Sequence, residues 1–178
     1  MAGTPTASTR RTATEIRRRR PRIGKARLHK LLYYVQGYHL AWNGRPAFGD
    51  RIEAWEMGPV VPALWHAEKR GRVLSDSEEP PEAVRNVITY VLRRVGDRTG
   101  PQLISATHAE APWRDATNGG QLIANQVISH ESLSEFFSIE SPDLKLVREA
   151  VRANGSDEPF EPDPPGLREA LRAELLSK

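Results

Sequence analysis

The sequence predicts a mainly α-helical domain with a small β element, a short strand or hairpin around residues 51–57. Two observations predict the helices: apolar residues recur at spacings of three and four along most of the chain, and glycine or proline ends these stretches. Residues 51–55, RIEAW, alternate polar and apolar side chains, which predicts the strand. With 178 residues, we expect one compact domain over residues 23–139.

The first strong helix signal covers about residues 25–43. Its apolar positions follow the spacing of one helix face: Leu28, Leu31, Leu32, Val35, Tyr38 and Trp42. Asn43 and Gly44 supply a left-handed stop, and Pro46 prevents the helix from resuming. We therefore expect an amphipathic helix that buries one broad stripe.

Aromatic residues concentrate in this helix and shortly after it. Tyr33, Tyr34, Tyr38 and His39 cannot all lie on one stripe, and tyrosine and tryptophan are enriched in interface hot spots. The candidate partner-binding residues are Tyr33, Tyr34, Tyr38, Trp55 and Trp113. The alternative, which the sequence leaves open, is a second internal layer that contains Trp42, Trp55, Trp113 and the tyrosines.

Further elements follow in order. The strand ends at Gly58-Pro59, since proline has no N–H to donate, and a helix is expected over residues 60–70, with Gly71 as its stop. Pro80-Pro81 opens a helix with the clearest apolar stripe of the chain, formed by Val84, Val87, Ile88, Val91, Leu92 and Val95.

The last third of the chain predicts shorter helices. Thr99 and Gln102 fit a capping box, and Ser129 fits an N-cap for a helix over residues 131–137, after a short apolar run over 122–128. Residues 140–178 are expected to form a helical, Pro- and acid-rich C-terminal extension. Its expected parts are a helix over 143–153, a linker, and a helix over 167–176.

Charge is distributed unevenly. Residues 1–30 hold ten Lys or Arg and one acid, Glu15, so this part carries +9 and the remainder −6, which together give the net charge of +3. We expect residues 1–22 to form a basic disordered arm, or a loosely helical one. Such an arm offers nucleic-acid contacts through Arg17, Arg18, Arg19, Arg20 and Arg22. The alternative is a solvated leader, because no aromatic residue lies among the arginines.

Several classes of function find no support in the sequence. The chain has no cysteine, which excludes disulfides and thiolate sites and suits the cytoplasm, and no apolar stretch is long enough to span a membrane. We expect no metal site, cofactor or catalytic residue. His-Ala-Glu occurs at residues 66–68 and 108–110, and a hydrolase that uses His108 and Glu110 is a weak alternative.

Three stretches together resemble a known family. Leu28, Lys30-Leu31-Leu32-Tyr33-Tyr34 and Gln36-Gly37 come first, then Ile52-Glu53-Ala54-Trp55 and Gly58-Pro59-Val60-Val61-Pro62, then Thr107-His108 and Ala111-Pro112-Trp113. In this order, over about residues 25–137, they resemble the Panacea domain, the SocA-like antitoxin family often found in prophages.

The resemblance implies a helical domain without known catalysis that neutralises a protein toxin encoded nearby by binding it directly. For one SocA-type member it also implies delivery of the toxin to the ClpXP protease. The motif residues expected to maintain the fold are Lys30, Leu31, Gly58, Pro59, His108 and Pro112. Family members usually have a helix before the Leu28 segment, where this chain has its arginine-rich arm.

Overall fold

The computed structural model describes residues 4–72, 75–121 and 126–140, together with residues 143, 147, 149, 150 and 153. The elements are α1 (Thr9–Arg19), α2 (Lys25–Asn43), β1 (Ile52–Trp55), β2 (Gly58–Val60), α3 (Pro62–Lys69), α4 (Glu82–Val95), α5 (Gly100–Ala109), α6 (Ala111–Ala116), β3 (Gln126–Ile128) and α7 (His130–Ile139). The predicted mainly α fold with a small β element is confirmed.

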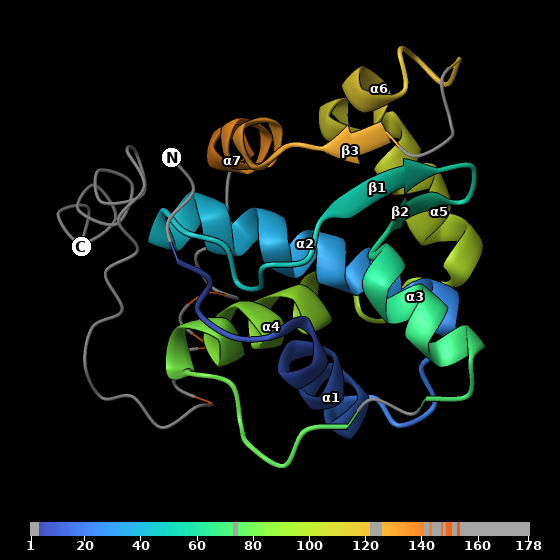
Figure 1. The fold of residues 1–178 in the computed structure, drawn as a ribbon. Helices are drawn as coiled ribbons and strands as arrows, with labels where there is room; N and C mark the ends of the chain where they lie inside the picture. The colour runs from blue at the N-terminus through green and yellow to red at the C-terminus, as the bar shows by residue number, and fades with distance from the viewer. Residues whose placement is uncertain are drawn as a thin grey trace, which may run out of the picture.

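Helix α2 lies at the centre of the molecule. In Figure 1, α1 and α4 lie on one side of it, α7 and the sheet lie on the other, and α3 and α5 lie near its N-terminal half. Every residue from Leu28 to Trp42 is buried. The helix ends at Gly44 with φ of 65°, as the Asn-Gly pair predicted.

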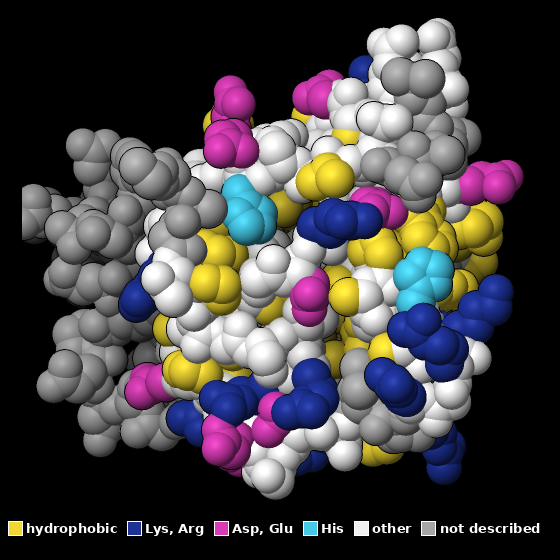
Figure 2. Space-filling model, in the orientation of Figure 1, with side chains coloured by type: hydrophobic (Ala, Val, Ile, Leu, Met, Phe, Trp, Pro, Cys, Tyr) yellow, Lys and Arg dark blue, Asp and Glu magenta, His cyan; other side chains and the backbone are white. Residues whose placement is uncertain are grey.

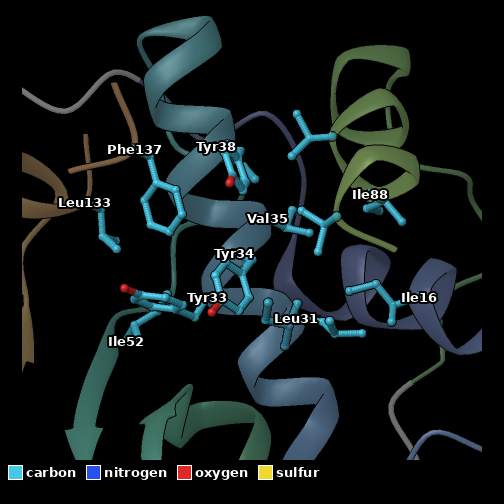
Figure 3. Close-up of a cluster of buried hydrophobic side chains, with 14 of the residues drawn as sticks. Ile16, Leu31, Tyr33, Tyr34, Val35, Tyr38, Ile52, Ile88, Leu133 and Phe137 are labelled. Carbon is cyan, nitrogen blue, oxygen red and sulfur yellow. The ribbon is translucent and has the colours of Figure 1, made fainter. Parts of the chain in front are cut away.

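The expectation that α2 buries one stripe is wrong, because its neighbours cover all of its sides. Figure 3 shows Ile16 of α1 and Ile88 of α4 on one side of α2, and Leu133 and Phe137 of α7 on the opposite side. A helix that is enclosed in this way needs apolar or internally bonded residues all round. This explains the aromatic run without an exposed face.

The expectation of a disordered arm is also wrong for residues 9–19, which form α1. Ser8 caps this helix by accepting a hydrogen bond from the amide of Arg11. Ala13 and Ile16 are fully buried in the core, where α1 packs against α2 and α4. This short apolar stripe anchors the helix despite the surrounding arginines, and a helix therefore does precede the Leu28 segment.

Helices α2 and α7 approach closely at Gly37. A β-carbon at this position would collide with the ring of Phe137. The glycine, which weakens an isolated helix, here allows an aromatic ring of α7 to lie directly on the backbone of α2.

The sheet is antiparallel, in the order β2-β1-β3. The hairpin pairs Glu53 with Val60, and β3 pairs Ile128 with Ile52. The sequence missed β2, because Pro59 argued against a strand; the structure places Pro59 in an edge strand, where a missing N–H is tolerated. Accordingly, α3 begins at Pro62, two residues later than expected.

The later helices agree with the sequence in most respects. The whole predicted stripe of α4 is buried, the Thr99–Gln102 capping box is present, and Ser129 caps α7. Helix α6 was not expected. Of the expected helix over residues 143–153, only isolated positions are described, and Val147 and Ala150 among them are helical and buried.

The expected linker and the helix over residues 167–176 lie outside the described residues. The domain boundaries proposed after residues 22 and 139 stay predictions. Among the described helices, none combines the length and apolar character that crossing a bilayer requires.

Candidate functional site

Tyrosine hydroxyls of α2 bind two carboxylates at the C-terminal ends of α5 and α7. Tyr33 and Tyr34 each donate a hydrogen bond of 2.8 Å to Glu110, one to each carboxylate oxygen. Tyr38 donates one of 2.8 Å to Glu140. We call these five residues the tyrosine–carboxylate cluster. They tie the centre of α2 to the two helix ends.

Other side chains complete this cluster. The ring of Phe137 packs against all three tyrosines, at centroid distances of 4.7 to 6.0 Å. Arg94 donates a 2.5 Å hydrogen bond to Glu140 and another, of 2.9 Å, to Tyr90. The carboxylate of Glu140 is thus neutralised by a guanidinium, whereas no ion pair to Glu110 is found among the described residues.

Burial sets the electrostatics of Glu110. Its pKa is raised from 4.5 to about 7, mainly by loss of solvation; the hydrogen bonds from Tyr33 and Tyr34 lower the pKa, and the nearby charge of Glu140 raises it. Burial likewise raises the pKa of both phenols well above their usual range. Glu110 therefore exchanges its proton near neutral pH.

The three tyrosines lie inside the molecule. Their exposed fractions are 0% for Tyr33, 3% for Tyr34 and 1% for Tyr38. In Figure 3 they point from α2 into the packed core. Of the two alternatives that the sequence left open, the structure favours the internal layer for these residues, and their role as partner contacts has no support in their placement.

The family-motif residues meet at the N-terminal half of α2. The buried ammonium of Lys30 donates a 3.2 Å hydrogen bond to the carbonyl of Pro59. Gly58 has φ of 91°, and a β-carbon there would lie 2.7 Å from Cε of Lys30 and 2.9 Å from Oγ1 of Thr107. Leu31 is buried in the core beside them. Three stretches far apart in sequence therefore form one junction.

No carboxylate pairs with Lys30 among the described residues. Burial lowers its pKa from 10.5 to about 8. The same environment, with the charges of Lys30, Lys25 and Arg17, lowers the pKa of buried His29 to about 3. The junction is a buried, electropositive part of the interior.

His108, Pro112 and Trp113 hold the hairpin to α5 and α6. The His108 ring stacks on Trp113 at a centroid distance of 4.0 Å, and Trp113 donates a 3.1 Å hydrogen bond to the carbonyl of Trp55. Pro112 lies in the first turn of α6. Trp113 is buried, whereas Trp55 is half-buried. Within the described residues no hydrogen bond joins His108 to Glu110, whose carboxylate binds Tyr33 and Tyr34 instead.

Most arginines of α1 bind acidic groups of the same chain. Arg18 and Arg19 bind buried Glu15, at 2.8 and 2.5 Å. Burial alone would raise the pKa of Glu15, but these two guanidiniums outweigh it and lower that pKa. Arg17 pairs with Glu68 of α3, and Arg20 lies 3.6 Å from Asp97.

This pairing changes the interpretation of the basic segment. Of the nucleic-acid candidates, only Arg22 is exposed and has no partner among the described residues. Figure 2 shows the same pattern over α1, where Lys/Arg and Asp/Glu side chains lie next to each other. Phosphate binding by these arginines would compete with ion pairs that stabilise the fold.

Exposed groups gather instead on the outer side of the hairpin and along α3. Met57, at the hairpin turn, is 60% exposed. A shallow groove of about 540 Å³ lies between β1 and the start of α3, lined in part by Arg51, Glu53 and His66. The buried Glu53 carboxylate accepts hydrogen bonds from Arg51 at 2.7 Å and from Trp55 at 2.9 Å.

No local pattern in the sequence indicates this groove or the pairing of Glu110 with the tyrosines, because each depends on residues from distant elements. The only hint was the His-Ala-Glu pattern at residues 108–110, which pointed to catalysis instead. The described part of the chain has no group of three or more His, Cys, Asp or Glu side chains that could hold a metal ion.

Comparison with known proteins gives two matches. Residues 28–114 match the family model described as antitoxin SocA-like, Panacea domain. The protein named antitoxin SocA from Caulobacter vibrioides is 28% identical over 145 residues, which cover 67% of this chain and 77% of that protein. No solved structure matches. The matched segment contains α2 from Leu28 onward, the hairpin and the motif junction.

Proposed function

We propose that this chain, whose residues 28–114 match the SocA-like Panacea domain, is an antitoxin that neutralises a protein toxin by binding it directly. The family match carries this proposal, and the similarity to an antitoxin over most of its length supports it. The toxin is expected to be encoded beside the gene of this chain.

The mechanism follows from how the chain is built. The central helix is enclosed on all sides, and hydrogen bonds from Lys30 of α2 and Trp113 of α6 hold the hairpin in place. A preformed binding surface of this kind suits stoichiometric occlusion of the active or membrane-acting surface of a toxin, with no turnover and no cofactor.

Co-expression tests the proposal. Each neighbouring gene is expressed alone and together with the tagged chain, and growth and copurification are measured. We expect one neighbour to arrest growth alone, to be silenced by this chain, and to copurify with it at a fixed ratio. If no neighbour is toxic, or if the silenced toxin never copurifies, direct neutralisation is wrong.

A protease-adaptor role, which the sequence resemblance implies, is a separate part of the proposal. It predicts that the chain shortens the half-life of the bound toxin in cells with ClpXP and not in cells without it. A pulse-chase measurement checks this. A toxin that is bound and silenced but keeps its half-life would contradict the adaptor role and leave direct binding intact.

A further inference from the structure

We propose that the toxin docks on one surface, formed by the tip of the β1–β2 hairpin and the exposed side of α3, and that it presents an acidic region to α3 and apolar side chains to the hairpin. We call this the hairpin–α3 surface, formed by Trp55, Met57, Trp65, Lys25, Lys69, Arg70 and Arg72. The inference rests on the proposed function and assigns its partner contacts.

The first step is the distribution of free charge. The arginines of α1 are mostly paired, and Glu68, the acid of α3, is bound by Arg17. In contrast, Lys69, Arg70 and Arg72 are exposed, and no described residue pairs with their side chains. Figure 2 shows Lys and Arg side chains over the region of α3 without Asp or Glu side chains among them.

These three cations are held close together by the end of α3. The amide of Arg70 donates a hydrogen bond to the carbonyl of His66, and the amide of Arg72 donates one to that of Ala67. Gly71, with φ of 74°, allows the chain to fold back in this way. Unpaired cations concentrated on one turn form a local positive field that steers an acidic partner.

The second step is the aromatic core of the surface. Lys25 lies 4.0 Å above the ring of Trp65 and donates a 3.1 Å hydrogen bond to its carbonyl. Trp55 packs against Trp65 at a centroid distance of 5.8 Å, with the planes at 67°. Both indoles are half-buried. Together they connect the cations of α3 to the hairpin.

The third step is the exposed apolar tip. Met57 is 60% exposed and lies two residues after Trp55 at the turn of the hairpin. Exposed methionine beside tryptophan and arginine is typical of the core of a protein interface. The groove between β1 and α3 adjoins this tip through His66, whose ring lies 6.1 Å from that of Trp55.

The aromatic geometry favours a protein over a nucleic acid. Single-stranded nucleic acid binds by stacking bases on free aromatic faces, with phosphates on nearby cations. Here Lys25 already covers a face of Trp65, and Trp55 meets Trp65 edge to face. The exposed acid Glu56 also lies at the turn of the hairpin, where it would repel a phosphate backbone.

Charge reversal tests the surface on the full chain, with the growth-arresting neighbour as the probe. The test variant is Lys69→Glu/Arg70→Glu/Arg72→Glu, and a second variant, Met57→Ser, tests the apolar tip. The matched control is Arg45→Glu/Arg114→Glu, which reverses two exposed cations that lie outside this surface and have no side-chain partner among the described residues. Circular dichroism and thermal unfolding verify that each variant folds.

We expect the triple variant to bind the toxin at least tenfold more weakly at low salt, to lose rescue of growth, and to show a smaller salt dependence than the parent chain. The Met57→Ser variant should bind more weakly with an unchanged salt dependence. The Arg45/Arg114 control should bind and rescue as the parent does. Should the triple variant fail to fold, Lys69→Gln/Arg70→Gln/Arg72→Gln replaces it. We then expect the same changes, with a smaller loss of toxin binding.

The outcomes separate this inference from the proposed function. If the parent chain silences and binds the toxin and the folded surface variants do so equally well, the docking surface is wrong and the antitoxin function stands. If the parent binds no toxic neighbour, both fail. If the triple variant instead loses binding to a fluorescent 20-nucleotide DNA that the parent binds, while toxin binding is unchanged, the surface serves nucleic acid and the inference is overturned.

Discussion

At the scale of single residues, two buried ionisable groups contribute to how the stability of this fold depends on pH. Glu110 lies under the hydroxyls of Tyr33 and Tyr34, and Lys30 lies against the carbonyl of Pro59. Neither group has a partner of opposite charge in the described part of the chain. Burial disfavours the charged form of each group. Folding therefore strengthens proton binding by Glu110 and weakens proton binding by Lys30.

For Glu110, the pKa is about 7 in the folded state against an ordinary value of 4.5. The folded state therefore binds the proton more tightly, and the free energy of unfolding should fall as pH rises from about 4.5 to about 7, by up to about 3 kcal/mol. The Glu110→Gln variant should lack this fall. Urea unfolding at a series of pH values measures it.

Buried His29 and His39 act in the opposite direction in the same range, because burial lowers the pKa of His29 to about 3 and that of His39 to about 4. The test is therefore the difference between the parent and Glu110→Gln at each pH. If that difference is constant from pH 4.5 to pH 7, Glu110 does not titrate as described.

Lys30 gives a prediction at alkaline pH. Its pKa is about 8 in the folded state against an ordinary 10.5. The unfolded state then binds more protons between these values, so stability should rise with pH from about 8 to about 10.5, by about 1 to 3 kcal/mol. The Lys30→Met variant should lose this rise, whereas Lys69→Met, at an exposed position, should keep it. A parent chain with a flat profile over this range would contradict the prediction.

At the scale of elements, the contact between α2 and α7 depends on one missing side chain. Gly37 allows the ring of Phe137 to lie on the backbone of α2, where the same ring also packs against the three tyrosines. Since this contact closes one side of the central helix, its geometry controls how α7 and the end that carries Glu140 are placed.

We predict that Gly37→Ala destabilises the protein by about 1 to 3 kcal/mol, despite the higher helix propensity of alanine, because the new methyl group collides with the Phe137 ring. Chemical denaturation measures this cost. Adding Phe137→Leu to Gly37→Ala should recover part of it, so the double-mutant cycle should show coupling. Independent effects of the two substitutions would mean that the contact is absent.

At the scale of the whole molecule, the family-matched segment 28–114 is smaller than the folded unit. Ala13 and Ile16 of α1 and Leu133 and Phe137 of α7 belong to the same core as α2, and β3 completes the sheet beside β1. Removing these elements exposes the two long sides of the central helix to water.

We therefore predict that a chain trimmed to residues 28–114 lacks a cooperative thermal transition and binds a hydrophobic dye, while a chain of residues 4–153 unfolds cooperatively. The loss of buried apolar surface on both sides of α2 is the physical reason. Calorimetry and dye fluorescence check this. If the short chain unfolds cooperatively at the same midpoint temperature as the longer chain, α1 and α7 are not needed for the stability of the fold.

The sequence by itself determined the elements whose signals are local. The stripe of α4, the glycine stop of α2, the Thr99–Gln102 box and the Ser129 cap arise between residues a few positions apart, and the structure has all of them. The three motif stretches likewise indicated the family before the fold was known. Local periodicity, however, does not say how many sides of a helix are covered.

Only the tertiary structure decided what lies against each face. It enclosed α2 on all sides and so placed the tyrosines inside, bonded Tyr33 to Glu110 from 77 positions away, and paired Arg17 with Glu68 from 51 positions away. At the end of α3 it exposed Lys69, Arg70 and Arg72, whose side chains have no partner among the described residues. Burial and charge neutralisation depend on such long-range contacts. For this reason the sequence predicted a basic arm over residues 1–22, whereas in the structure most of these arginines are paired and exposed cations lie at the end of α3.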